Sequence, residues 1–259
     1  MKMYELIPIK SIRHKLRARY NPRHEIRIDK NTRCLCVAPH PDDEMIGCGG
    51  LLCLYPDNFD VVIMGSSGTD YKNRTAHEHA KTRTAEFNAI MKKLGIKNHW
   101  IYQTYGVRGI EQMDAMFEQY IRDLDTKKYD YIFLPVPHDR HQDHNHITNK
   151  LFKRILRKNG YSKDLKIVFY EVWSLIPNPN VFVDITSVID KKCKILSMYK
   201  SAHVLFQYAE VTNDLNRCRG HQMGMPEGYA EAYYIDSVCN YIKNNYKIDQ
   251  DYGIEQNGK

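Results

Sequence analysis

The sequence lacks any apolar run long enough to cross a membrane. A spanning helix needs about 20 consecutive apolar residues, and no window of this 259-residue chain approaches that pattern. Residues 1–33 also lack the apolar core of a secretory signal, because they are basic and interrupted by Pro8 and Pro22. We therefore expect a cytoplasmic protein. Its 42% hydrophobic and 27% charged residues are typical of a globular chain.

The cysteines offer little from which a disulfide framework could be built. Seven is an odd number, and we expect no signal peptide that would direct the chain to an oxidising compartment. Cys34 and Cys36 alternate with leucine and valine, and Cys48 and Cys53 flank the start of an apolar segment. A zinc site made of these four would have spacings that match no common structural-zinc pattern well. We expect free, buried thiols that pack as small hydrophobic side chains.

Nucleotide and nucleic-acid motifs are also missing. The glycine-rich stretch at residues 47–50 is neither a Walker sequence nor the GxGxxG fingerprint. The formal net charge is +7, and much of it lies in residues 1–33. This segment is either a solvated arm or a region that attracts an anionic substrate, a membrane surface or nucleic acid. Nucleic acid is the least favoured partner, because basic and aromatic residues do not interleave.

Short apolar runs alternate with segments of helical periodicity from residue 33 onward. This order predicts crossover units whose strands are buried on both faces. The predicted fold class is α/β, a Rossmann-like, mostly parallel sheet flanked by helices, with a smaller C-terminal α/β extension. The predicted strands are 34–38, 60–65, 99–102, 129–134, 167–173, 181–184 and 229–235, and the predicted helices are 45–55, 75–94, 112–124, 143–157, 188–202 and 208–218.

The chain contains no internal repeat and no linker that would separate a second domain. We expect a basic N-terminal arm over residues 1–32, a single domain over 33–240 and a polar, frayed C-terminal tail over 241–259. Open α/β sheets place their functional sites at the carboxyl ends of the strands. Two segments at such positions are rich in ionisable side chains.

The first segment, residues 38–50, follows the first predicted strand and reads APHPDDEMIGCGG. One histidine and three acidic residues thus share a proline-stiffened turn at the start of a helix. A single acid would suffice to cap that helix, so three beside a histidine exceed the need. Successive turn residues point in different directions, so one aspartate can bind a metal beside His40 while its neighbour faces a water molecule. Spacing alone leaves open whether Asp42 or Asp43 is the ligand.

The second segment, residues 137–146, follows the fourth predicted strand and reads PHDRHQDHNH. His141 and His144 are three residues apart, so one helical turn would place both on one face. A polar loop would explain these histidines if they stood alone. Together, however, the two segments supply His, Asp and His ligands with spare acid–base groups, which is the composition of a catalytic zinc site with an open position.

Both segments resemble motifs of the PIG-L (LmbE-like) N-acetylglucosaminyl deacetylase family. Residues 38–44 resemble its AHPDDE signature with Pro39 inserted, and residues 141–144 resemble its HxDH motif. The resemblance implies a Zn²⁺ cofactor held by His40, Asp43 and His144. It also implies hydrolysis of the acetamide of an N-acetylated sugar, a GlcNAc-like small molecule that is free or linked to a nucleotide or lipid.

The same resemblance assigns the catalytic groups. Asp42 would be the general base, and His141 would help zinc to stabilise the oxyanion that forms on the acetyl carbonyl. Asp143 would orient His141. Either Asp42 or His141 would protonate the departing amine, and the sequence leaves that choice open.

Other residues carry weaker predictions. Arg83 and Glu231 are candidate substrate contacts, although an exposed helix arginine and a strand end would explain them as well. Trp173 is expected in the core rather than as a sugar platform, and His77 and His79 at the surface. The alternative functions are a zinc amidohydrolase acting on another acyl amide and a basic nucleic-acid-binding protein. The sequence does not predict an oligomeric state.

Overall fold

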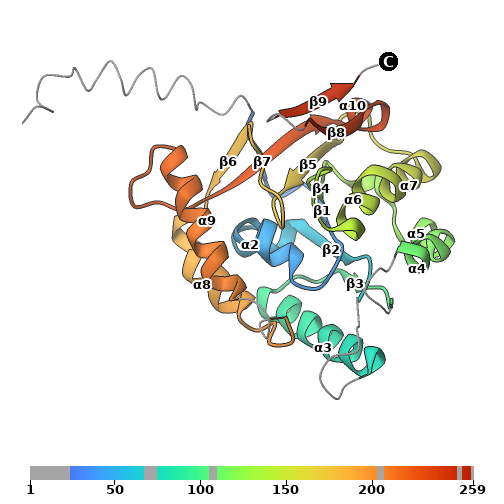
Figure 1. Ribbon diagram of the computed structural model, residues 1–259, viewed down its shortest axis with the longest axis horizontal. Coiled ribbons are helices and arrows are strands. Elements are labelled where there is room, and N and C mark those ends of the chain that lie inside the picture. Colours follow the sequence, from blue (N-terminus) through green and yellow to red (C-terminus); the bar gives the residue numbers. More distant parts are fainter. Residues whose placement is uncertain (1–23, 67–74, 105–109, 203–206, 250–252, 258–259) are drawn as a thin grey trace, which may run out of the picture.

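A seven-stranded sheet forms the centre of the computed structural model, which describes residues 24–66, 75–104, 110–202, 207–249 and 253–257 (Figure 1). The strand order is β3-β2-β1-β4-β5-β7-β6, with β7 antiparallel to both of its neighbours and every other pair parallel. All seven predicted strands are confirmed, and so is the mostly parallel α/β class. The strands are β1 (Cys34–Ala38), β2 (Phe59–Ile63), β3 (His99–Ile101), β4 (Tyr131–Pro135), β5 (Lys166–Tyr170), β6 (Val181–Asp184) and β7 (Ala230–Ser237).

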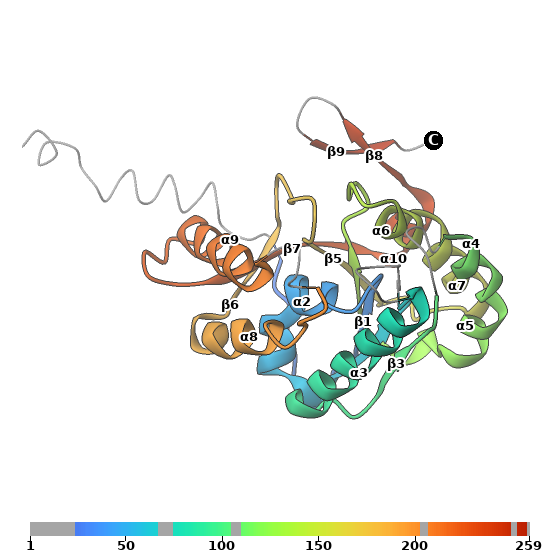
Figure 2. The same ribbon diagram turned by 60° about the horizontal axis from the view of Figure 1, so that its bottom comes forward.

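Helices cover both faces of this sheet, as Figures 1 and 2 show. Because side chains alternate along a strand, Cys34 and Cys36 of β1 pack on one face, and Leu35 and Val37 pack on the other. The first face is covered by α2 (Asp43–Leu54), α3 (Ala76–Leu94), α8 (Ile189–Leu196) and α9 (Tyr208–Gln222), and the second by α4 (Ile110–Ala115), α5 (Phe117–Asp123), α7 (Phe152–Asn159) and α10 (Val238–Lys243).

The four cysteines of the first predicted strand and helix are free and buried, as expected. The ends of α3 follow local chemistry: Thr75 and Glu78 form a reciprocal capping box, and Gly95 closes the helix with a left-handed φ of 86°. The glycine at position 47 lets α2 approach the sheet, because a Cβ there would lie 2.1 Å from the ring of Tyr170. Close packing, rather than phosphate binding, therefore accounts for this glycine.

Several predicted elements differ in detail. The helix expected over 112–124 is split into α4 and α5. The helix expected over 143–157 consists of α6 (Gln142–His146), a π-helical segment, η3 (Ile147–Leu151), and α7. Four short helices were not predicted: η1 (Pro56–Asn58), η2 (Thr126–Lys128), η4 (Thr186–Val188) and α10.

The ends of the chain bear on the predicted arm and tail. In the expected polar tail, β8 (Asn245–Asp249) and β9 (Gly253–Asn257) form an antiparallel pair instead of an irregular end. Most of the predicted basic arm lies outside the described residues, so the division into arm, domain and tail stays a prediction. None of the helices in the described part of the chain combines the length and apolar character that a bilayer-spanning helix needs.

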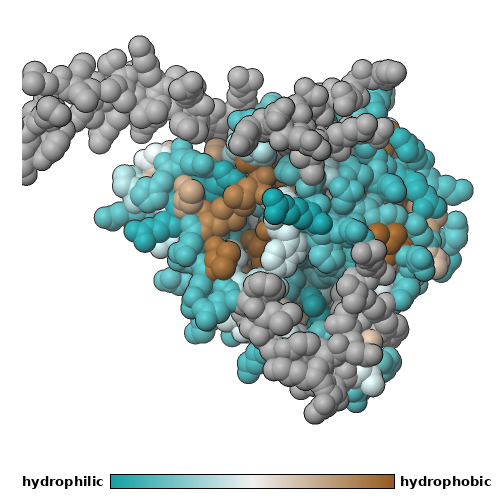
Figure 3. All heavy atoms as spheres, in the orientation of Figure 1, coloured by the Kyte–Doolittle hydropathy of each residue, from teal (hydrophilic) through white to brown (hydrophobic). Residues whose placement is uncertain are grey.

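Two predicted positions are corrected by burial. Trp173 is 42% exposed rather than part of the core, because it lies on the loop after β5 and not within the strand. On the face drawn in Figure 3, which is mostly hydrophilic, hydrophobic surface gathers beside α9. His79, near the start of α3, is buried and not at the surface, whereas His77 is exposed as expected.

A buried ion pair joins α2, α8 and β7. The Lys192 ammonium lies 2.8 Å from the Glu231 carboxylate, and both side chains are almost completely buried. Glu231 also accepts hydrogen bonds from the backbone N–H groups of Gly50 and Leu51 and from the hydroxyl of Tyr233. This carboxylate is therefore fully engaged in holding α2 against the sheet.

Replacing Lys192 with methionine should lower the free energy of unfolding by about 3–5 kcal/mol, because it leaves the Glu231 carboxylate buried without its cation. Urea denaturation followed by circular dichroism measures the change. The control is Lys194→Met, since Lys194 is exposed on the same helix. Similar losses in both variants would show that the pair contributes nothing special.

Candidate metal centre

The two motif segments meet because β1 and β4 are adjacent parallel strands. Cys34 of β1 pairs with Tyr131 of β4, so the carboxyl ends of both strands lie at the same edge of the sheet. His40 and Asp43 follow β1, with Asp43 as the first residue of α2. His144 follows β4 on the short helix α6. Residues about one hundred positions apart in the sequence therefore share one buried site, as predicted.

Three donor atoms of this site form a nearly equilateral triangle. Asp43 Oδ2 lies 3.4 Å from His40 Nδ1 and 3.2 Å from His144 Nε2, and the two nitrogens are 3.3 Å apart. Ligands 2.0–2.2 Å from a tetrahedral zinc ion are roughly 3.3–3.6 Å from one another. We call these three residues the donor triangle. Its dimensions fit a tetrahedral metal ion that keeps one position for a water molecule.

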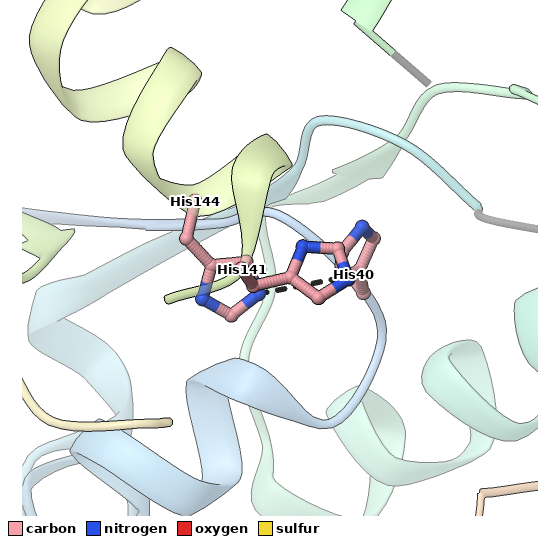
Figure 4. A group of neighbouring side chains, drawn as sticks. All are labelled: His40, His141 and His144. Carbon is pink, nitrogen blue, oxygen red and sulfur yellow. Dashed lines mark hydrogen bonds between the residues drawn. The ribbon is translucent and has the colours of Figure 1, made fainter. Parts of the chain in front are cut away.

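His141 points toward the same centre (Figure 4), and its ring lies 4.8 Å from that of His40 and 4.7 Å from that of His144. The donor atoms of the three histidines lie within 4.8 Å of one another, so these residues are a second candidate ligand set. That span exceeds a tetrahedral edge, and Asp43 therefore fits better as the third ligand. His141 is the N-cap of α6, where its Nδ1 accepts a hydrogen bond from the backbone N–H of Asp143 at 3.3 Å.

Each histidine of the donor triangle has a carboxylate at its other ring nitrogen. Asp143 Oδ2 is 2.9 Å from His40 Nε2, and Asp139 Oδ1 is 3.5 Å from His144 Nδ1. Such carboxylates fix the tautomer and the orientation of metal-binding imidazoles. The expectation that Asp143 orients His141 is therefore corrected, since its carboxylate contacts His40. Asp139 was missed, because its sequence position did not distinguish it from the other polar residues of the segment.

Asp42 lies beside the donor triangle in a strained conformation. Its φ of 119° is the only positive value of a non-glycine residue in the described parts of the chain. Its backbone N–H donates to the carboxylate of Glu44, which in turn accepts from the hydroxyl of Tyr199. Both Glu44 and Tyr199 are buried and stabilise this turn. Positive φ values of this kind cost about 1–3 kcal/mol and concentrate at functional sites.

Arg83 of α3 approaches the same turn, and its role as a substrate contact stays a prediction. Its guanidinium donates to the carbonyl of Pro41 at 2.6 Å and lies 3.5 Å from the carboxylate of Asp42. Glu231, the other predicted substrate contact, does not line the site. The backbone of α2 and the ammonium of Lys192 surround its carboxylate instead, and its assignment as a substrate contact is therefore wrong.

The environment shifts the pKa values of the site in opposite directions. Burial raises the pKa of Asp42 to about 7, although the guanidinium of Arg83 opposes this change. Burial and the neighbouring imidazoles lower the pKa of His141 to about 4. Burial also lowers the pKa of His144, but the carboxylate of Asp43 outweighs it, so that the pKa is about 10. Without a metal, His144 is therefore cationic and His141 neutral at pH 7.

The charges of the site fit a bound cation. Four buried carboxylates, those of Asp42, Asp43, Asp139 and Asp143, surround imidazoles that must be neutral to act as ligands. Buried carboxylates are stable only when paired with cations or hydrogen-bond donors. A divalent ion in the donor triangle would supply the charge that protonated imidazoles otherwise provide.

Comparisons with known proteins agree with this geometry. Residues 35–156 match the model of the PIG-L family, described as GlcNAc-PI de-N-acetylase. The diacetylchitobiose deacetylase of Thermococcus kodakarensis is 25% identical over 186 aligned residues, which cover 65% of this chain and 69% of that protein.

Two solved structures share the fold. The N,N'-diacetylchitobiose deacetylase of Pyrococcus horikoshii has a TM-score of 0.61 and 20% identity, covering 91% of this chain and 95% of that one. The 4-carboxy-2-hydroxymuconate hydratase GalB of Pseudomonas putida has a TM-score of 0.56 and 17% identity, covering 85% and 99%. At such identities the similarity establishes the fold alone. The chain thus carries a PIG-L domain over residues 35–156, a segment that contains both predicted motifs and the whole donor triangle.

Proposed function

We propose that this protein is a zinc-dependent N-deacetylase, which hydrolyses the acetamide of an N-acetylated sugar to an amine and acetate. The observation that carries the proposal is the donor triangle of His40, Asp43 and His144 with the strained Asp42 beside it. A metal site with a neighbouring carboxylate of near-neutral pKa is suited to activating water. The family match and the deacetylase relative support an acetamide as the bond that is cleaved.

The donor triangle would hold the zinc ion. His40 and His144 would bind through Nδ1 and Nε2, respectively, because the opposite nitrogen of each ring faces a carboxylate. When bound, zinc would make a water molecule more acidic and polarise the acetyl carbonyl.

Asp42 is the proposed general base. It lies outside the donor triangle, and its carboxylate is 3.5 Å from the guanidinium of Arg83. Its pKa is about 7 without metal and would be lower beside a bound dication, so its carboxylate is ionised near neutral pH and can accept the proton of an attacking water molecule. Arg83 holds the turn through the Pro41 carbonyl and keeps a positive charge next to the base.

His141 is the proposed donor to the oxyanion. Its low pKa keeps the ring neutral, and its Nδ1 accepts a backbone hydrogen bond, so the single ring proton resides on Nε2. This Nε2–H can donate to the negative charge that develops on the carbonyl oxygen. As the C–N bond breaks, the nitrogen takes up a proton from Asp42, which has just received one, or from His141.

Comparing the rates at which candidate compounds are hydrolysed identifies the substrate within this class. GlcNAc, N,N'-diacetylchitobiose, nucleotide- and lipid-linked GlcNAc and simple N-acyl amides separate a sugar deacetylase from an amidohydrolase of another acyl amide. We further predict that the basic arm attracts an anionic substrate or a membrane surface. We also predict a cytoplasmic location. Nucleic-acid binding remains the least favoured function, and it predicts oligonucleotide affinity that falls steeply with salt.

Metal analysis of protein purified without chelator should find about one zinc ion per chain. Asp43→Asn and His144→Ala should lose it, whereas His141→Gln should keep it, because His141 lies outside the donor triangle. Mass spectrometry of the metal and circular dichroism of each variant provide the measurements. Loss of metal from His141→Gln with retention in Asp43→Asn would instead favour the three-histidine set.

Replacing Asp42 with asparagine should lower kcat for acetate release by about 10²–10⁴-fold, since the amide cannot accept the proton of water. The metal content and the fold should remain unchanged. Asp57→Asn serves as the control, because Asp57 is an exposed aspartate that pairs with Lys97. Equal activity of Asp42→Asn and the wild type would remove Asp42 from the mechanism.

The value of kcat/KM should decrease as the pH falls through the pKa of Asp42, because the protonated carboxyl is no base. That pKa is about 7 without metal, and a bound dication would lower it, so the acidic limb should lie below pH 7. A pH–rate profile on the zinc-loaded enzyme tests this. A rate that increases toward acid would contradict the assignment.

A further inference from the structure

Exposed apolar side chains gather next to the metal centre. In the described part of the chain, Trp173 is 42% exposed, Leu175 52% and Val211 64%. The Trp173 ring meets the ring of Tyr208 edge to face, with centroids 5.6 Å apart. Val211 follows Tyr208 by three residues and shares its face of α9. We call these four residues the aromatic ridge, and Figure 3 shows hydrophobic surface in this region beside α9.

The loop that carries Trp173 and Leu175 is firmly held. At its base, the buried carboxylate of Glu171 pairs with Arg219 and accepts the backbone N–H of Ile176 at 2.6 Å. Arg219 also donates to the carbonyl of Ile176 at 3.0 Å. A loop fixed by a buried ion pair presents its apolar side chains to water in a defined position. Their exposure is therefore a built feature and not the result of a loose segment.

The same loop is attached directly to the metal centre. The backbone N–H groups of Trp173 and Ser174 donate to Asp139 Oδ2 at 3.1 and 3.3 Å. The other oxygen of Asp139 is the one that faces His144. The partner ring of Tyr208 is also close, since the charges of Asp42 and Asp43 add to burial in raising the pKa of its hydroxyl. The aromatic ridge thus forms part of the rim of the site.

The chemistry of this rim suits a sugar ring. A pyranose with equatorial substituents presents a flat face of C–H groups, and contact with an indole ring removes apolar surface from water on both sides. Hydroxyl groups at the edge of the sugar remain hydrated, which an open rim permits. An acyl chain would require an enclosed apolar groove instead, and Trp173 and Leu175 are too exposed to form one.

We propose that Trp173, supported by Tyr208, is the platform for a second sugar ring that is linked to the N-acetylated one. This inference rests on the proposed function, because the first ring must place its acetamide at the donor triangle. It predicts that the substrate is at least a disaccharide. It also makes Trp173 a specificity-determining residue rather than a member of the core.

Kinetics with GlcNAc and N,N'-diacetylchitobiose test the platform. The wild type should have the higher kcat/KM for the disaccharide. Trp173→Ala should lower the ratio of the two kcat/KM values about tenfold by raising KM for the disaccharide. The lost stacking contributes to binding and not to the chemical step. The values for GlcNAc should not change. The matched control is Tyr55→Ala, since Tyr55 is exposed at the far end of α2.

Equal effects of Trp173→Ala on both substrates, or no effect on either, would overturn the platform. A greater gain from octyl β-GlcNAc than from the disaccharide, lost in Trp173→Ala, would also overturn it, because it would identify an acyl chain as the occupant. Trp173→Phe should recover part of the preference, since a smaller aromatic face remains.

Fluorescence separates failure of the platform from failure of the proposed reaction. The chain has two tryptophans, Trp100 and Trp173, and Trp100 lies in β3. Adding N,N'-diacetylchitobiose should change the emission of the wild type but not that of Trp173→Phe. Such a change without acetate release would keep the platform and reject the deacetylase. Acetate release with no change in emission would keep the deacetylase and reject the platform.

Discussion

The structure of the site depends on four buried carboxylates at the adjoining ends of β1 and β4. Two of them, Asp139 and Asp143, face the outer nitrogens of His144 and His40, and this leaves the inner nitrogens directed at Asp43. The arrangement favours positive charge strongly enough to raise the pKa of His144 to about 10. A metal ion satisfies the same electrostatic demand without the protons, so metal affinity and imidazole acidity are two consequences of one charge distribution.

The strained backbone at Asp42, in the turn between β1 and α2, is also explained by what the site requires. The proposed mechanism requires different roles of two successive aspartates, since Asp43 completes the donor triangle while Asp42 would serve the reacting water. Asp42 has a positive φ, and its carboxylate faces Arg83, whereas that of Asp43 faces His40 and His144. Glu44 and Tyr199 stabilise that conformation from within the core, where burial raises the pKa of Glu44 to about 8. The third acid of the motif is therefore a support for the first and not a spare catalytic group.

The sequence predicted the features that local hydrophobic patterns and motifs determine, namely the strands and the motif residues of the site. Apolar runs identified all seven strands of the sheet, and two motifs identified the residues that meet at its edge. It could not predict contacts that only the tertiary structure creates. Glu231 looked available at a strand end but is enclosed by Lys192 and α2. Trp173 looked like a core residue, because the sequence does not reveal that β5 ends at Tyr170. It also does not reveal that Asp139 holds the following loop outside the core.

The fold alone does not decide the reaction, because a hydratase shares it with deacetylases. Both kinds of chemistry need activated water and a proton donor, because hydration delivers the proton to carbon and amide hydrolysis delivers it to the leaving nitrogen. His141 is suited to the role of such a donor. Its neighbours hold it neutral, and the start of α6 occupies its Nδ1, so its one proton is on the nitrogen that remains for the substrate. That proton, beside the donor triangle and Asp42, fits the proposed hydrolysis, and the family match supports an acetamide as the bond that is cleaved.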